Sequence, residues 1–189
     1  MGYYDDSKHV DEYIHMCDEY DGKNIYELLA KHLNKGSTLL ELGSGPGLDI
    51  KNLKEYYKIS GSDLSEEFLK RLKLKFPDIP FFNIDITNID VKGRYDCIYS
   101  NKVLHHIDKD QLQTSLIQQK KHLTENGLIA HSFWIGEESM QMHGLLFTYY
   151  TKNAILELIQ KNFEILETLS YTEFEDNDSL VVIAKAIEN

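Results

Sequence analysis

Three glycines at alternate positions, Gly43, Gly45 and Gly47, follow a short apolar run of the chain. Glycine has no Cβ, so the backbone of such a turn can approach a ligand closely. The dinucleotide-binding pattern needs a further glycine at its sixth position to receive a pyrophosphate, and Leu48 stands there. Glu41, just before the turn, would repel a pyrophosphate but suits a ligand with cationic groups. The turn therefore predicts a site for a nucleotide-like ligand that is not a dinucleotide.

A second carboxylate, Asp63, stands at the end of the next apolar run, residues 58–62. In a parallel sheet a carboxylate in this place can accept hydrogen bonds from both hydroxyls of a ribose. The combination of a glycine turn and an acid at this spacing is more specific than either feature alone. Together they indicate a ribose-containing ligand.

The elements that position these residues follow from hydrophobic periodicity. We expect strands at residues 38–42, 58–62, 79–85, 95–101 and 127–133, with helices at 48–56, 65–76 and 109–123. This alternation predicts a parallel sheet with helices on both faces. One or two helices over residues 10–33 come first. After a helix at 151–161, strands at 163–171 and 180–186 should pair antiparallel because their connection is short.

Composition excludes several classes of protein. The 189 residues include 20 Lys and Arg against 31 Asp and Glu, a formal charge of −11, and 42% are hydrophobic. This is typical of a folded acidic protein, and its charge disfavours nucleic acid as a partner. The chain has no apolar signal segment and no run of ~18 apolar residues, so we expect a cytoplasmic protein without membrane contact. Cys17 and Cys97 are expected to be free thiols, and no metal site is expected.

The glycine turn and Asp63 resemble the class I S-adenosylmethionine-dependent methyltransferases, and the resemblance extends over about residues 33–186. It implies that Glu41 to Gly47, Ser44 included, form the loop beneath the methionine and ribose of the cofactor. It also implies that Asp63 holds the ribose hydroxyls and that Leu64 lies beside the adenine.

Two later segments share this resemblance. In the third-strand motif, Asp85 would accept a hydrogen bond from the adenine amino group, and Ile86 would offer its backbone N–H. In the fourth-strand motif, Ser100 occupies the position that usually contacts the methionine end. Family members that methylate nucleobase amines or protein glutamines carry Asn or Asp, Pro, Pro and an aromatic residue there. This chain has Ser100-Asn101-Lys102-Val103, so a small-molecule acceptor is expected instead.

The resemblance implies a Rossmann-like α/β fold. Its seven-stranded, mostly parallel sheet should carry a C-terminal antiparallel hairpin and an N-terminal helical lead-in. Within one compact domain, we expect residues 1–34 to form a helical lid and residues 35–189 to bind S-adenosylmethionine. The chain is expected to be a monomer or a homodimer.

Methyl transfer from a sulfonium mainly requires the acceptor to be held in line, and a base helps only when the acceptor must lose a proton. His105 and His106 follow the fourth strand, at the edge where such sheets bind ligands. His143 lies in the Met-rich and aromatic-rich segment 134–150. These three histidines are the candidate bases, although the first two could simply cap a loop. Segment 134–150 could cap the substrate or merely cover the sheet edge, and His131 is more typical of a core residue.

Tyr20, beside the helix break at Asp21-Gly22, either covers the methionine end of the cofactor or belongs to an ordinary helix cap. The helix dipole alone accounts for Asp49, in the first turn after the glycines. Two other functions stay open. An NAD-dependent oxidoreductase of the short-chain type would need Tyr-x-x-x-Lys after the fourth strand, but that spacing occurs only at Tyr4 to Lys8. The second open function is a cofactor-binding module without catalysis, because methyltransferases need few indispensable side chains.

Overall fold

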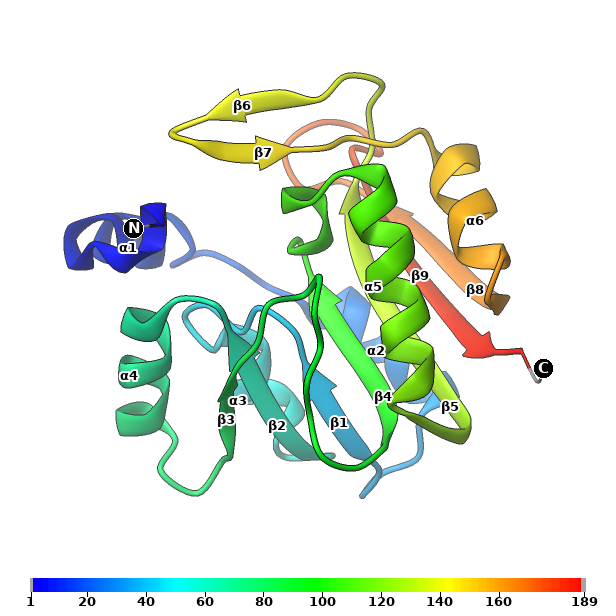
Figure 1. Cartoon of the computed structure of the whole chain (residues 1–189), viewed down its shortest axis with the longest axis horizontal. Helices are drawn as coiled ribbons and strands as arrows, with labels where there is room; N and C mark the ends of the chain where they lie inside the picture. Colours follow the sequence, from blue (N-terminus) through cyan, green and yellow to red (C-terminus); the bar gives the residue numbers. More distant parts are fainter. Residues whose placement is uncertain (1, 188–189) are drawn as a thin grey trace.

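A seven-stranded sheet forms the centre of the protein, whose computed structural model describes residues 2–187. The strand order is β3-β2-β1-β4-β5-β9-β8 (Figure 1). In chain order these strands are β1 (Thr38–Glu41), β2 (Lys58–Asp63), β3 (Phe81–Asn83), β4 (Tyr95–Asn101), β5 (Leu123–Trp134), β8 (Phe163–Tyr171) and β9 (Ser179–Ala186). β1 to β5 pair in parallel, whereas β9 runs antiparallel to both β5 and β8. The predicted α/β class, Rossmann-like sheet and C-terminal antiparallel hairpin are confirmed.

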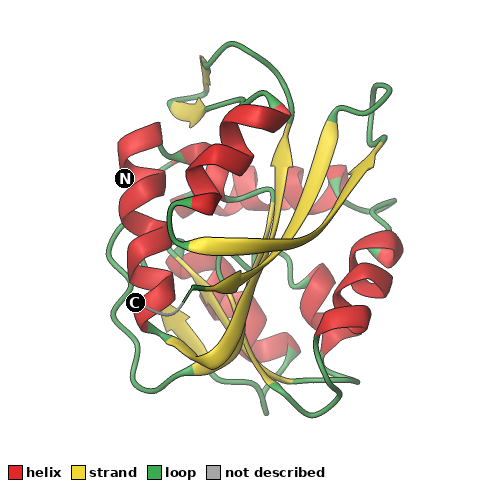
Figure 2. Cartoon of the chain, turned by 90° about the vertical axis from the view of Figure 1, so that its right-hand side faces the viewer, coloured by secondary structure: helices red, strands yellow, loops and turns green. Residues whose placement is uncertain are grey.

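Helices cover both faces of the sheet (Figures 1 and 2). One face carries α5 (Lys109–Lys121) and α6 (Lys152–Gln160), and the other carries α2 (Lys23–His32), α3 (Leu48–Leu53) and α4 (Glu66–Lys75). Successive strand residues point to opposite faces, so β4 supplies both cores. Ile98 is buried on the face of α5 and α6, and Cys97 and Tyr99 are buried on the face of α2 to α4.

Local sequence signals account for several element boundaries. The Ser65 hydroxyl accepts the Phe68 N–H at 3.2 Å, which makes Ser65 the N-cap of α4. Thr151 caps α6 in the same way. β3 is shorter than the predicted strand 79–85 because the chain turns after Asn83, where the Asn88 N–H donates to the Asp85 carbonyl.

Segment 134–150 contains a small hairpin of β6 (Met140–Met142) and β7 (Leu145–Phe147), which the sequence patterns did not predict. Its two-residue loop, His143-Gly144, has φ angles of 53° and 78°. A positive φ at both positions is the geometry that matches the twist of a tight hairpin. In Figure 1 this hairpin projects above the carboxyl ends of β4 and β5.

The N-terminal residues separate into two parts. α2 contributes Ile25, Leu28 and Leu29 to the core of the domain. The 3-10 helix η1 (Tyr3–Asp5) and α1 (Ser7–Met16) lie instead against α4, at the left of Figure 1. A lid role for residues 1–34 stays a prediction, and residues 1, 188 and 189 lie outside the described residues. Within residues 2–187, no helix has both the length and the apolar content needed to cross a membrane.

Candidate functional site

The glycine turn, residues 43–47, joins the end of β1 to the start of α3. Gly43, Gly45 and Gly47 have φ angles of 67°, 46° and 72°, in the left-handed region that favours glycine. A Cβ at Gly43 would come within 2.5 Å of the Val103 side chain, so that glycine is also required for packing. At Gly45 the nearest atom would be on Tyr13, at 3.8 Å. The middle of the turn is therefore open to a ligand.

Glu41 is buried directly before this turn and is only 2% exposed. Among the described residues, no group donates a hydrogen bond to its Oε2 atom. Burial, reinforced by the negative charge of Asp49, raises the pKa of Glu41 well above its usual value. A buried carboxylate oxygen without a partner is costly, and a ligand that carries an amine or a sulfonium would relieve that cost.

Asp63 ends β2 on the other side of the turn. Its Oδ2 accepts the Gly45 N–H at 2.8 Å and its Oδ1 accepts the Ser65 N–H at 2.9 Å. Burial raises the pKa of Asp63, although these two backbone hydrogen bonds oppose the rise. A carboxylate offers about four acceptor sites, so both oxygens retain capacity for the hydroxyls of a ribose.

The candidate adenine residues follow two paired strands: Leu64 comes directly after β2, and Asp85 and Ile86 follow β3. Leu64 is 63% exposed, which leaves an apolar side chain uncovered directly after Asp63 in the chain. Asp85 is exposed, and its Oδ1 accepts the N–H and the hydroxyl of Thr87, both at 2.7 Å. Ile86 is half-buried against the core on the face of α5. The Asp85 carboxylate is thus oriented by its own turn.

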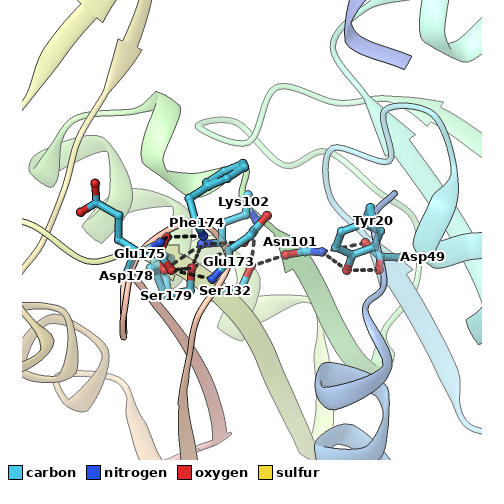
Figure 3. A network of polar contacts seen from close by, with 11 residues as sticks. Tyr20, Asp49, Asn101, Lys102, Ser132, Glu173, Phe174, Glu175, Asp178 and Ser179 are labelled. Carbon is cyan, nitrogen blue, oxygen red and sulfur yellow. Dashed lines mark hydrogen bonds and ion pairs between the residues drawn. The ribbon is translucent and has the colours of Figure 1, made fainter. Parts of the chain in front are cut away.

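Asp49, which the helix dipole seemed to explain, lies at the centre of a buried hydrogen-bond network (Figure 3). Its Oδ1 accepts the hydroxyls of Tyr20 at 2.9 Å and Tyr26 at 2.6 Å, and its Oδ2 accepts the Asn101 amide at 3.2 Å. Burial raises the pKa of Asp49, and these three hydrogen bonds oppose the rise. The network holds Tyr20 beside the glycine turn.

Asn101, rather than Ser100, faces this network. The Ser100 hydroxyl contacts His131 Nδ1 at 2.9 Å, and His131 Nε2 contacts Gln119 of α5 at 2.7 Å. This contact lies on the opposite face of the sheet from Glu41, and burial lowers the pKa of His131 to about 3. The side chain of Ser100 is therefore not brought together with the other candidate cofactor residues. Side chains alternate between the two faces of a strand, so Asn101 lies on the same face as Cys97 and Tyr99. This alternation along β4 was the sequence signal that could have identified Asn101 as the residue facing the network.

His105 and His106 lie in the 3-10 helix η2 (Leu104–His106), just beyond β4. His105 is 4% exposed, and no described group pairs with its Nδ1. His106 is half-buried, and its Nδ1 contacts the Leu146 carbonyl at 2.8 Å. Burial lowers the pKa of both rings. His143 lies apart from these two residues, exposed at the tip of the β6–β7 hairpin. Its ring stacks on that of Tyr3, with ring centroids 5.3 Å apart.

We use the name acceptor edge for the carboxyl ends of β4 and β5 together with η2, residues 134–150 and the loop 172–178. The β6–β7 hairpin reaches the N-terminal segment there. Between them lies a hollow of about 390 Å³, lined by residues that include Tyr3, His9 and His143. Segments that are distant in sequence thus converge around this hollow.

These features fit S-adenosylmethionine. The unpartnered oxygen of Glu41 suits a cation, the turn at Gly45 is open, and Asp63 can still accept hydrogen bonds from hydroxyls. Leu64 supplies exposed apolar surface for a base. The residues expected at the cofactor converge on one edge of the sheet, apart from the side chain of Ser100.

Comparisons with known proteins agree with this geometry. A family model described as a methyltransferase domain matches residues 39–127. Malonyl-[acyl-carrier protein] O-methyltransferase 1 of Ilyobacter polytropus is 25% identical over 191 residues, which cover 92% of this chain and 68% of that protein.

Solved structures share the fold at low sequence identity. The 1,6-didemethyltoxoflavin-N1-methyltransferase of Burkholderia thailandensis, with S-adenosylhomocysteine bound, has a TM-score of 0.80 and 20% identity, covering 94% of this chain and 83% of its own. The N-methyltransferase NodS of Bradyrhizobium japonicum has a TM-score of 0.73 and 18% identity, covering 92% and 91%. With the matched family model and the acid-lined glycine turn, the chain belongs to the class I S-adenosylmethionine-dependent methyltransferases.

Proposed function

We propose that this methyltransferase acts on a small-molecule acceptor bound at the acceptor edge. The observation that carries the proposal is the position of Glu41, whose Oε2 has no hydrogen-bond partner among residues 2–187 and which precedes the open glycine turn, next to Tyr99 of β4. The structural relatives include enzymes named for small acceptors, such as 1,6-didemethyltoxoflavin. The formal charge of −11 disfavours a polyanionic acceptor such as nucleic acid.

The residues around the turn would hold the cofactor from three sides. Glu41 would pair with its cationic methionine end, Asp63 would accept from the ribose hydroxyls, and Leu64 would pack beside the adenine. When bound, S-adenosylmethionine supplies a methyl group that its sulfonium already activates. The protein then has to orient an acceptor atom in line with that methyl group and exclude water. Tyr20, fixed by Asp49 and Asn101, would limit the space at the methionine end.

Among the three candidate histidines, the geometry favours His106 as a base. Its contact with the Leu146 carbonyl requires a proton on Nδ1, so Nε2 is free to accept a proton. Burial lowers the pKa of His106, which keeps the ring neutral at pH 7. His105 is more deeply buried and supports this ring through a contact with ring centroids 4.0 Å apart, and His143 lies on the exposed hairpin tip.

Calorimetry with S-adenosylmethionine, S-adenosylhomocysteine and NAD tests the cofactor part of the proposal. We expect saturable binding of the first two ligands and none of NAD. Transfer of labelled methyl groups to a metabolite library then tests the acceptor class. If the cofactor binds but no small molecule is methylated, the chain is a binding module or acts on a macromolecule, and this proposal is wrong.

Once an acceptor that must lose a proton is known, the three histidines can be separated by kinetics. His106→Ala should lower kcat by ~10²- to 10⁴-fold with cofactor affinity preserved, as loss of a general base does. His143→Ala should have a much smaller effect. His15→Ala, on the exposed end of α1, is the matched control. Wild-type kcat in all the variants, His105→Ala included, would show that positioning alone drives the reaction.

A further inference from the structure

Lys102 has an unusual backbone and an unusual environment for a lysine. Its φ angle is 54°, one of three positive values at residues other than glycine within residues 2–187. It follows β4 directly, at the acceptor edge, and its side chain is only 11% exposed. A strained backbone and a buried cation both cost stability, and such costs are concentrated at functional sites.

The Lys102 ammonium is enclosed by groups from β5, β9 and the loop 172–178 (Figure 3). It donates to the Ser179 hydroxyl at 2.6 Å and to the Phe133 carbonyl at 3.3 Å. It lies 3.2 Å from the centroid of the Trp134 ring, a cation–π contact. Neutral groups thus fix the direction of the ammonium, and among the described residues one carboxylate, Glu173, provides its ion pair at 3.3 Å.

Glu173 is held loosely compared with the loop around it. The 3.3 Å separation from Lys102 exceeds the 2.7–2.9 Å of a tight charge-assisted hydrogen bond. Within the described part of the chain, the only other donor close to the Glu173 carboxylate is the Ser179 hydroxyl, at 3.5 Å. By contrast, Asp178 fixes the loop backbone by accepting the N–H groups of Glu173, Phe174 and Glu175 at 2.8–3.0 Å. The Glu173 side chain can therefore move while the loop stays in place.

An aromatic surface adjoins this ion pair. Phe174 is 79% exposed and stacks on Trp134 with ring centroids 5.5 Å apart and planes 19° from parallel. Contact between this apolar ring and water does not stabilise the protein. Next to a cation, the ring offers a flat apolar face to a ligand that is itself flat and negatively charged at one end.

The pair is also connected to the cofactor side of the sheet. The Lys102 N–H donates to the Ser132 hydroxyl at 2.9 Å, and that hydroxyl donates to Asn101. Asn101 in turn contacts Asp49 and Tyr20 beside the glycine turn. The lysine therefore adjoins the place where the methyl group would be transferred.

We propose that Lys102, Trp134 and Phe174 form an acceptor subsite for a planar aromatic molecule with one carboxylate, and that Glu173 holds the place of that carboxylate until the acceptor binds. This inference rests on the proposed function and specifies its substrate class. One carboxylate is consistent with a protein whose charge repels polyanions. The incoming carboxylate displaces Glu173 toward solvent and takes over its ion pair with Lys102.

Trp134 is the single tryptophan of the chain, so intrinsic tryptophan fluorescence reports directly on this subsite. The protein, saturated with S-adenosylhomocysteine, is titrated with benzoate and, in parallel, with its neutral isostere benzamide. We expect a saturable change in emission with benzoate and at least ~10-fold weaker binding of benzamide, because the charge-assisted contact with Lys102 is lost.

Three variants sharpen the experiment. Glu173→Gln removes the competing carboxylate and should tighten benzoate binding ~3- to 10-fold, because an unpaired buried cation gains a counterion. Lys102→Met should weaken benzoate binding at least ~10-fold with little effect on benzamide. Lys152→Met is the matched control. This exposed lysine at the start of α6 donates to Ser170 at 3.5 Å and makes no other polar contact within residues 2–187, so its removal should change the affinity for neither ligand.

Equal affinity for benzoate and benzamide would overturn the inference, as would the absence of any emission change. Unchanged or weaker benzoate binding in Glu173→Gln would overturn it too, and this variant does not depend on whether Lys102→Met folds. Calorimetry of S-adenosylhomocysteine binding on the same samples distinguishes a failure of the proposed function from a failure of the acceptor subsite. Loss of that binding contradicts the proposed function, whereas intact cofactor binding without a preference for benzoate contradicts only the acceptor subsite.

Discussion

The glycine turn and the acceptor edge lie side by side on the same sheet, yet they are built in different ways. The turn and the acidic residues on either side of it, Glu41 and Asp49, come from one continuous segment, which Asp63 from the neighbouring strand completes. The acceptor edge joins residues from β4, η2, the β6–β7 hairpin and the loop 172–178. Its contacts span large sequence separations, as between Lys102 and Ser179.

This difference also appears in what each region uses for recognition. The turn offers a defined backbone conformation, the buried carboxylate of Glu41 and the half-buried carboxylate of Asp63. The acceptor edge uses side chains held by one another, such as Asn101 between Asp49 and Ser132. The first arrangement tolerates few substitutions, whereas the second can change its specificity without changing the fold. Four experiments test that contrast.

The largest effect is expected from Gly45→Val. Its branched side chain would fill the open centre of the turn, so we expect affinity for S-adenosylmethionine to fall at least ~100-fold. Gly36→Val is the matched control, because Gly36 also has a positive φ, 84°, and a Cβ added there would meet no atom within 4 Å. Both variants should keep native circular dichroism. Full binding by Gly45→Val in calorimetry would show that the turn does not hold the cofactor.

Asp63→Ala should weaken S-adenosylmethionine binding by ~1.5 to 3 kcal/mol, the scale of charge-assisted hydrogen bonds to two hydroxyls. The variant also removes the acceptor for the Gly45 N–H, so the turn loses part of its support. Asp78→Ala, an exposed carboxylate after α4, controls for the change in net charge. Unchanged affinity in a folded Asp63→Ala protein would refute the ribose assignment.

Asn101→Ala tests the connection between the two regions. Its amide joins Tyr20 and Asp49 to Ser132, and its loss should lower the free energy of unfolding by about 2 kcal/mol, because a buried carboxylate loses a donor. Asn52→Ala, on the exposed side of α3, should cost much less. Urea unfolding measures both. Equal costs would mean that the network has no special stabilising role.

The smallest effect concerns pH. Burial raises the folded-state pKa of Glu41 above its usual value of 4.5, so the folded state retains a proton that the unfolded chain releases. The stability from this group is therefore present below about pH 4.5 and is lost as pH rises toward the higher folded-state pKa. Glu41→Gln cannot ionise, so its unfolding free energy should decline less between pH 5 and pH 7.5 than that of the wild type. The unfolding free energy of the control Glu164→Gln, at an exposed position, should change with pH as that of the wild type does. If Glu41→Gln also shows the wild-type pH dependence, Glu41 is not protonated in the folded state.

The sequence determined the fold and the geometry of the glycine turn because their signals are local. Apolar periodicity marked the central strands and helices within a few residues. The Gly43 to Gly47 spacing specified a backbone turn, and Asp63 followed from its place at the end of a strand. In each case the responsible residues are neighbours in sequence, so the pattern and the structure carry the same information.

Only the tertiary structure decided which side chains meet at the acceptor edge. In the sequence, the helix dipole is enough to explain Asp49. In the structure, Asp49 accepts hydrogen bonds from Tyr20, Tyr26 and Asn101. Ser100 matched a family position, but the alternation of β4 turns its hydroxyl toward His131 on the other face. Lys102 and Glu173 pair because β4 and the loop before β9 end at the same edge. Such contacts depend on strand order and register, which a single sequence does not encode in any local pattern.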